Sequence, residues 1–320
     1  MIDYIPNFLF KNKHFNTCFP TLFRKVNIEY QRERLETPDE DFLDIDWIKN
    51  NNNKLLILCH GLEGSSHSQY IKGMAKFFSD RSWDILAMNY RGCSGELNKK
   101  PYFYHSGFTQ DLDFLVNINK KYSQIALVGF SLGANMILKY LGERNNYPKN
   151  LIGAAVVSPP CDMEGCSIKI RQFSNKIYTL NFLKSLKQKV LDKDKLYPGI
   201  YENYIDLKKL SQAKELHDFD EFFTAPLHGY RNAHDYYENN SSKKLLKNIK
   251  LPTFILMPLD DPIMSTSSYP FIESQKNNFI TLETPKFGGH VGFAALEDSP
   301  YWDEKKIFEF LSDISINSNI

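Results

Sequence analysis

The stretch IALVGFSLGANMILKYLGE, residues 125–143, decides how the rest of the chain is interpreted. Its first six residues are typical of a strand buried on both faces, and its last twelve have the pattern of a helix. Between them lies G-x-S-x-G, residues 129–133, where the strand turns sharply into the helix. The helix directs its N-terminal amides and positive dipole end at a forming oxyanion. We therefore predict that Ser131 is a nucleophile, with an ordinary N-cap serine as the alternative.

On both sides of this stretch, short aliphatic runs alternate with helical patterns, which indicates a mostly parallel sheet covered by helices. The predicted strands are 28–34, 42–48, 55–59, 83–89, 125–130, 151–157, 253–257 and 279–282. The predicted helices are 70–78, 108–121, 132–142 and about 303–312. Because residues 42–48 alternate apolar and acidic side chains, we expect an antiparallel strand with one face in water.

One region interrupts the alternation of strands and helices. From Pro159 to about Asn248 the pattern contains no convincing strand and is rich in helix-like runs with Lys, Tyr and Phe. We predict an α/β core of residues 1–159 and 248–320, and a helical cap, residues 160–247, inserted across the carboxyl ends of the strands. An ordinary pair of packing helices is the alternative.

The composition indicates which kinds of binding partner and which cellular compartment to expect. The 320 residues contain 39 Lys+Arg and 38 Asp+Glu, so the net charge of +1 creates no field that would attract nucleic acid. Five scattered cysteines predict no disulfide framework and fit a reducing, cytoplasmic location. We expect no secretory signal and no transmembrane helix. Aromatic and basic residues alternate over residues 4–25, which leaves peripheral contact with lipid open, although Pro6 and Pro20 disfavour a long amphipathic helix.

A catalytic serine requires a base and an orienting acid. Of the eight histidines, only His290 follows the last predicted strand, in the loop GGHVGF, residues 288–293. Asp260 and Asp261 follow the strand 253–257, and the chain order serine, acid, histidine then matches an α/β-hydrolase triad. We predict His290 as the base and Asp261 as the acid, with Asp260 as the alternative.

The sequence HGLEGSS, residues 60–66, follows the predicted strand 55–59 and is a candidate oxyanion loop. An H-G pair at this position delivers a backbone amide toward the nucleophile. We predict that the backbone N–H groups of Leu62 and Leu132 bind the oxyanion. We expect His60 to order the loop and Glu63 to be solvated.

Several further motifs occur in the same order as in one known family. They are HGLEGS (60–65), NYRGCSG (89–95), YHSG (104–107), GFSLGAN (129–135), FTAPLHGY (223–230), DDP (260–262) and GGHVGF (288–293). In these motifs the chain resembles, over nearly its whole length, the α/β-hydrolases typified by bacterial YheT and plant embryogenesis-associated proteins. The resemblance implies the α/β-hydrolase fold, with a twisted sheet of about eight strands, and supports Ser131, Asp261 and His290 as the triad. Relatives usually carry His-x-Gln-Thr where this chain has residues 14–17, HFNT, and we expect that stretch to contact the core.

The family implies hydrolysis of carboxylic esters without a cofactor. We therefore predict a serine esterase that forms an acyl-enzyme on a small-molecule ester, with lipid-like esters included. An acyltransferase or thioesterase with the same triad, and a catalytically idle ligand-binding homologue, are the alternatives. We expect no metal site at His228, His234 and Asp235, because no third ligand at metal spacing accompanies the histidines. We expect a structural salt bridge for Arg91.

Overall fold

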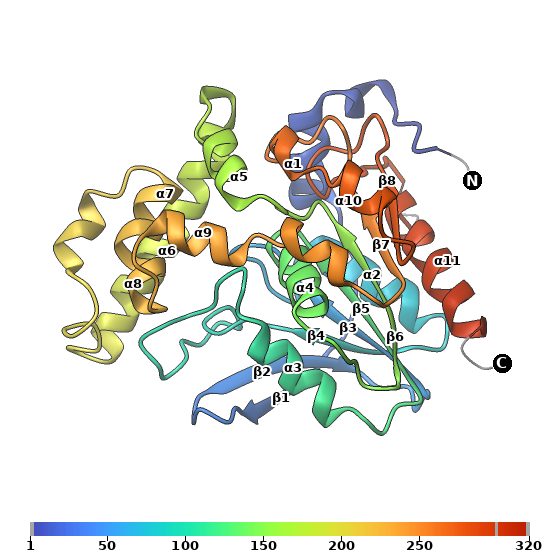
Figure 1. Ribbon diagram of the computed structural model, residues 1–320, viewed down its shortest axis with the longest axis horizontal. Coiled ribbons are helices and arrows are strands. Elements are labelled where there is room, and N and C mark those ends of the chain that lie inside the picture. The colour runs from blue at the N-terminus through green and yellow to red at the C-terminus, as the bar shows by residue number, and fades with distance from the viewer. Residues whose placement is uncertain (1–2, 298–299, 318–320) are drawn as a thin grey trace.

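An eight-stranded sheet forms the centre of the computed structural model, which describes residues 3–297 and 300–317 (Figure 1). Its strands are β1 (Gln31–Glu36), β2 (Phe42–Ile48), β3 (Lys54–Cys59), β4 (Asp84–Met88), β5 (Gln124–Phe130), β6 (Leu151–Val157), β7 (Thr253–Leu256) and β8 (Ile280–Glu283). They lie in the order β1-β2-β4-β3-β5-β6-β7-β8. The β1–β2 and β2–β4 pairs are antiparallel, whereas β3 to β8 run parallel. The carboxyl ends of β3 to β8 therefore meet at one edge of the sheet, where functional loops converge.

Helices cover both faces of this sheet. On one face α2 (Gln69–Ser79) packs beside α11 (Trp302–Asn317), and on the other α3 (Thr109–Ile118) packs beside α4 (Leu132–Gly142). The short α10 (Phe271–Gln275) lies between β7 and β8 in the chain. All eight predicted strands are confirmed, with boundaries that differ by no more than about three residues.

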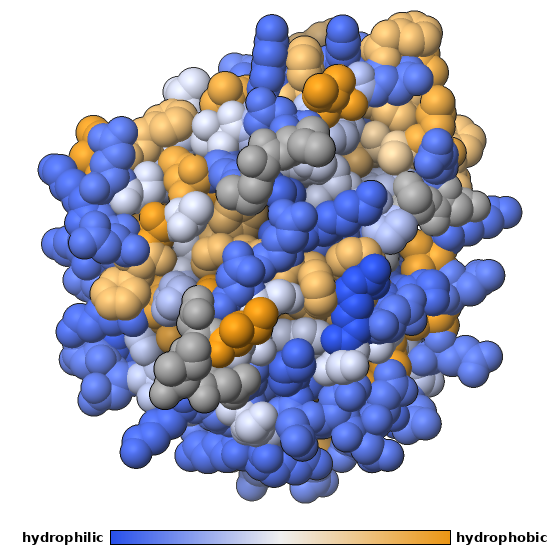
Figure 2. Space-filling model, turned by 90° about the vertical axis from the view of Figure 1, so that its right-hand side faces the viewer, coloured by the Kyte–Doolittle hydropathy of each residue, from blue (hydrophilic) through white to orange (hydrophobic). Residues whose placement is uncertain are grey.

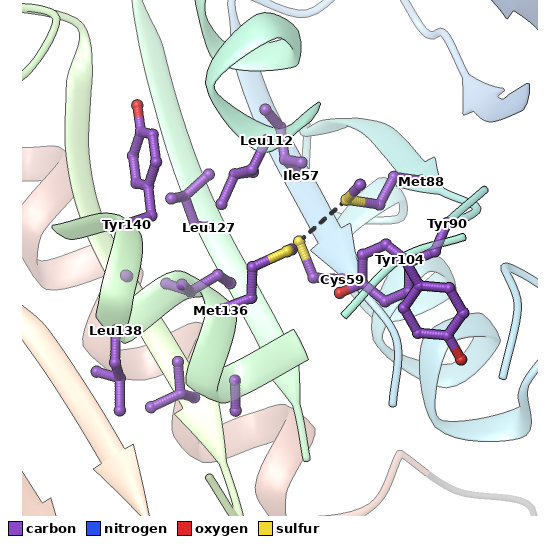
Figure 3. Close-up of a cluster of buried hydrophobic side chains, with 14 of the residues drawn as sticks. Ile57, Cys59, Met88, Tyr90, Tyr104, Leu112, Leu127, Met136, Leu138 and Tyr140 are labelled. Carbon is purple, nitrogen blue, oxygen red and sulfur yellow. Dashed lines mark hydrogen bonds between the residues drawn. The ribbon is translucent and has the colours of Figure 1, made fainter. Parts of the chain in front are cut away.

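The apolar core consists of two clusters, one on each face of the sheet. In β3, Leu55, Ile57 and Cys59 belong to one cluster, and Leu56 and Leu58 belong to the other. The central strands are thus buried on both faces, as their unbroken apolar runs predicted. Figure 3 shows part of the first cluster, in which the Cys59 sulfur lies 3.4 Å from the Met88 sulfur. Burial raises the pKa of the Cys59 thiol, so this cysteine is an inert packing residue.

Strand β2 departs from its predicted environment. Its antiparallel direction is confirmed, but the prediction of a face in water is wrong, because Asp44 and Asp46 are both buried. Arg34 and Arg32, on the exposed neighbour β1, reach over and each bind one of these carboxylates with two hydrogen bonds of 2.7–2.9 Å. Burial by itself raises the pKa of Asp46, but hydrogen bonds from Arg32 and other donors lower it overall. Strand β1, not β2, is the wet edge of the sheet.

The N-terminal region forms a short helix that the sequence did not predict. Helix α1 (Lys13–Phe23) begins after Asn12, whose side chain caps two backbone N–H groups, and it tolerates Pro20 near its end. With 11 residues it is not the long amphipathic helix that the prolines disfavour. No helix within residues 3–297 and 300–317 is long and apolar enough to cross a membrane. Figure 2, which views the side of the molecule on which α11 lies, shows a mostly hydrophilic surface with apolar side chains gathered along its upper right edge.

Between β6 and β7 the described chain contains helices and turns but no strand. The helices are α5 (Met163–Ile170), α6 (Lys176–Leu196), α7 (Leu216–Phe219), α8 (Ala225–Leu227) and α9 (Ala233–Asn240). Figure 1 shows α6 to α9 gathered beyond one end of the sheet. We call residues 160–247 the helical segment; its separation from the core as a cap stays a prediction.

Candidate active site

The turn between β5 and α4 holds Ser131 in a conformation that few non-glycine residues adopt. Its φ of 52° and ψ of −118° lie outside the ordinary regions, and its N–H donates to the Val157 carbonyl at 2.9 Å. Glycine is required on both sides. A Cβ at position 129 would lie 2.7 Å from the Gly133 carbonyl oxygen, and one at position 133 would lie 2.5 Å from the His60 carbonyl oxygen. The G-x-S-x-G pattern therefore follows from the close packing of this turn.

Three of the predicted site residues meet at the carboxyl edge of the sheet. The Ser131 Oγ lies 2.9 Å from the His290 Nε2, and the His290 Nδ1 lies 2.8 Å from the Asp261 Oδ2. The other oxygen of Asp261 accepts hydrogen bonds from the backbone N–H groups of Ile263 and Met264, at 2.9 and 3.2 Å. Since a carboxylate can only accept, His290 donates from Nδ1, and its Nε2 is free to accept the serine proton.

Asp260, the alternative acid, points elsewhere. Its Oδ1 accepts a hydrogen bond from the Gly289 N–H at 2.9 Å, and its buried Oδ2 has no hydrogen-bond partner among the residues that the structure describes. Burial raises the pKa of this carboxyl group to about 6. Asp260 thus contacts the backbone of the histidine loop, whereas Asp261 contacts the imidazole.

The loop that carries His290 is held by residues near the N-terminus, which sequence reasoning missed. The His290 N–H donates to the Thr17 Oγ1 at 2.8 Å, and the Ala294 N–H donates to the Asn16 Oδ1 at 2.9 Å. Gly289 has a φ of 60°, and a Cβ there would lie 2.7 Å from the Thr17 hydroxyl. The only signal in the sequence was the departure from the family pattern at residues 14–17. The burial of Asn16 agrees with the expectation that this stretch contacts the core, and Thr17 in addition supports the candidate base.

This contact leads to a prediction for Thr17. Thr17→Val keeps the shape of the side chain but removes the acceptor of the His290 N–H, so we expect kcat to fall about tenfold, in line with about 1–3 kcal/mol for an orphaned buried donor. Thr17→Ser, which retains the hydroxyl, is the matched control and should stay near wild type. Steady-state kinetics on a p-nitrophenyl ester measures both. Equal kcat values in the two variants would show that the hydroxyl does not position His290.

The candidate oxyanion donors are backbone N–H groups that lie near Ser131 and His290. Within residues 3–297 and 300–317, neither the Leu62 N–H nor the Leu132 N–H donates a hydrogen bond to another protein group. Leu132 is the first residue of α4, so the positive end of that helix dipole reinforces its N–H. The loop of Leu62 runs against the serine, because a Cβ at Gly61 would lie 3.2 Å from the Ser131 Cβ.

The predictions for two residues near Leu62 differ in how the structure bears them out. His60 orders the loop, as predicted: it is fully buried, its Nδ1 donates to the Gly61 carbonyl at 2.7 Å, and its Nε2 accepts from the Tyr90 N–H at 3.2 Å. Burial lowers the pKa of His60 to about 3, so the ring is neutral. The prediction for Glu63 is wrong. Its side chain is only 6% exposed and forms an ion pair of 2.6 Å with Lys189 of α6.

A cavity of about 170 Å³ joins these groups to the helical segment. Ser131 and His290 line it on the core side, together with Leu62 and Leu132. The helical segment contributes apolar walls, which include Ile170, Phe182, Leu186, Phe219 and Phe223. An apolar cavity that ends at the Ser131 hydroxyl has the character of a binding site for an uncharged, largely apolar small molecule.

The other residues singled out from the sequence are placed as follows. His228 lines the cavity, whereas His234 is exposed and lies 3.0 Å from Glu164. The described residues contain no group of three or more His, Cys, Asp or Glu side chains suited to a metal ion. Arg91 is buried and forms ion pairs with three carboxylates, of which Asp111 lies 2.7 Å away, so the predicted structural salt bridge is confirmed.

All five cysteines are free thiols. Cys161 and Cys166 are buried, and burial raises the pKa values of their thiols to about 12 and 11. Cys166 lies 3.0 Å from the Ser268 hydroxyl. Both cysteines thus behave as protonated packing residues.

A serine in a sharp strand-to-helix turn, a histidine and a carboxylate in contact at the carboxyl edge of a mostly parallel sheet are the arrangement typical of α/β hydrolases. The chain belongs to the α/β-hydrolase fold family, whose model matches residues 54–294. It is 35% identical to the YheT protein of Escherichia coli (strain K12) over 97% of this chain and 93% of that protein.

Other relatives and solved structures agree with this family. The embryogenesis-associated protein EMB8 of Picea glauca is 29% identical over 96% of this chain and 71% of its own length. Phospholipase ABHD3 of Mus musculus is 27% identical over 86% of this chain and 69% of its own length. The Pyrococcus furiosus esterase Pf2001 superposes with a TM-score of 0.60 at 17% identity, covering 91% of this chain and 96% of that chain. The last comparison shows the shared fold.

Proposed function

We propose that this protein is a serine hydrolase that cleaves carboxylic esters through an acyl-enzyme. The observation that carries the proposal is the continuous contact from the Ser131 Oγ through His290 to Asp261, at 2.9 and 2.8 Å. Membership of a family with esterase-type and lipase-type relatives supports it.

In the proposed reaction, His290 takes the proton of Ser131 as the Oγ attacks the ester carbonyl carbon. The carbonyl oxygen becomes an oxyanion, which the N–H groups of Leu62 and Leu132 bind. His290 then gives the proton to the leaving alkoxide, so that the alcohol departs and the acyl group stays on Ser131. Water, deprotonated by His290, attacks the acyl carbon; the bond to the Ser131 Oγ then breaks, His290 returns the proton to that oxygen, and the carboxylic acid leaves. Asp261 keeps the imidazole oriented and stabilises its protonated form throughout.

We propose a lipid-like ester as the substrate. The apolar cavity beside Ser131 supports this choice, as do two relatives named phospholipase ABHD3 and monoacylglycerol lipase. Exposed Phe8, Leu22 and Phe23 near the N-terminus, with Lys11 and Lys13 between them in the chain, support peripheral contact with the lipid in which such an ester resides.

Labelling with a fluorophosphonate, followed by peptide mapping, tests the proposal. We expect a single adduct on Ser131 and turnover of p-nitrophenyl esters with an optimum of chain length between acetate and palmitate. Addition of competing alcohols or thiols separates hydrolysis from acyl transfer, because a transferase would form the new ester or thioester as the main product. Absence of both labelling and turnover would overturn the proposal in favour of a ligand-binding protein.

A further inference from the structure

Glu63, the residue that follows Leu62, is bound through both its backbone and its side chain. Its N–H donates to the Tyr104 hydroxyl at 2.7 Å, and that hydroxyl donates back to the Glu63 Oε1 at 2.9 Å. The Lys189 Nζ donates to the same carboxylate oxygen at 2.6 Å, and the Ser185 hydroxyl donates to the other oxygen at 2.5 Å. Glu63 has a φ of 54°, a conformation that an unsupported non-glycine residue rarely keeps. These four contacts therefore hold the backbone directly beside the Leu62 N–H.

Two of these partners come from the helical segment, not from the core. Ser185 and Lys189 are four residues apart on α6, so they lie on one face of that helix. The core partner, Tyr104, whose ring lies beside that of Tyr90 in Figure 3, is itself held by stacking on it. The two ring centroids are 4.9 Å apart. The loop of Leu62 is thus clamped between a fixed tyrosine of the core and α6.

The charge of Glu63 matters for the same site. Glu63 and Lys189 line the same cavity as Ser131, and their side chains are only 6% and 11% exposed. An unpaired carboxylate in such a place would repel a forming oxyanion, because the Coulomb interaction is weakly screened there. Lys189 cancels that charge. Burial by itself lowers the pKa of Lys189, but Cys93 and Glu63 raise it overall, so the ammonium stays protonated.

We propose that Glu63 is a positioning residue for ester hydrolysis, an inference that rests on the proposed function. Its ion pair with Lys189 and its bonds to Ser185 and Tyr104 set the direction of the Leu62 N–H, so the oxyanion site is complete only when α6 is docked. The helical segment then contributes to the chemical step as well as to the walls of the cavity.

Four variants test this role: Glu63→Ala, Glu63→Gln, Lys189→Met, and the double variant Glu63→Gln/Lys189→Met. We expect Glu63→Ala to lower kcat about 10²-fold, the usual effect of losing one oxyanion donor, with KM within about threefold of wild type. Affinity for a trifluoromethyl ketone, which forms a tetrahedral adduct on Ser131, should fall by the same factor as kcat. Ester binding, measured in a Ser131→Ala background, should not change. Glu202→Ala, which removes an exposed carboxylate of the helical segment, is the matched control.

The charge argument gives the sharper comparison. Glu63→Gln keeps an acceptor oxygen and should fold normally, so a small loss of kcat is expected. Lys189→Met leaves the carboxylate unpaired and should lose more, and the double variant should recover at least about tenfold relative to Lys189→Met alone. A kcat within threefold of wild type in Glu63→Ala, or no recovery in the double variant, would overturn the inference while leaving the proposed function intact. An inactive, unlabelled wild-type protein would overturn both.

Discussion

Replacing Ser131 by alanine is expected to lower kcat about 10⁶-fold, the loss seen when a triad serine is removed, while the protein stays folded. The fold should persist because alanine has the same Cβ as serine and meets the same backbone constraint at φ 52°. The Oγ makes its contact with the His290 Nε2, so the change removes the reacting atom and little else. Hydrolysis of a p-nitrophenyl ester measures the loss, and the thermal unfolding midpoint checks the fold.

Ser158 offers a matched control for this experiment. It follows β6 as Ser131 follows β5, it has a φ of 50°, and its buried Oγ has no hydrogen-bond partner in the described part of the chain. Ser158→Ala should therefore keep wild-type turnover. Wild-type turnover in Ser131→Ala would refute the assignment of the nucleophile, and so would an equal loss in the two variants.

Asp261→Asn is expected to lower kcat about 10⁴-fold, because it forces the wrong tautomer on His290. The Asp261 Oδ1 accepts from the backbone N–H groups of Ile263 and Met264, and the oxygen of an asparagine would occupy that place. The asparagine NH₂ would then face the His290 Nδ1, which must become an acceptor. The ring proton moves to Nε2, where it blocks transfer from Ser131.

The neighbouring carboxyl group provides the control for this second variant. Asp260→Asn retains the oxygen that accepts from the Gly289 N–H and does not alter the contact with the imidazole. We expect its kcat to stay within about tenfold of wild type, since the substitution alters only a side chain that contacts the loop of His290. Steady-state kinetics from pH 5 to pH 9 measures both variants. A larger loss in Asp260→Asn than in Asp261→Asn would reverse the assignment of the acid.

Local patterns in the sequence predicted the sheet and the serine turn of this protein well. The central strands β3 to β7 follow from short apolar runs, because burial on both faces leaves few polar positions in the repeat. The turn at Ser131 follows from two glycines, because a Cβ at either position would lie too close to a neighbouring carbonyl oxygen. Chain order and loop composition were enough to select His290 and to favour Asp261 over Asp260, and the structure brings His290 and Asp261 into contact.

Charged and polar side chains were predicted less well, because their environment depends on partners far away in the chain. The acidic residues of β2 were expected in water, yet arginines of β1 bury them. Glu63 was also expected in water, but its partner Lys189 lies 126 residues away on a helix whose packing a local pattern does not encode. Thr17 supports the N–H of His290 across 273 residues.

The sequence by itself determined the α/β order of elements, the strained serine turn, and a set of candidates that consists of Ser131, His290 and a pair of aspartates. These features depend on backbone preferences and burial within a few neighbouring residues. Only the tertiary structure decided that Asp261 rather than Asp260 faces the imidazole, and that α6 reaches the loop of Leu62. These contacts depend on the relative placement of segments that are distant in the chain, which close packing in three dimensions selects.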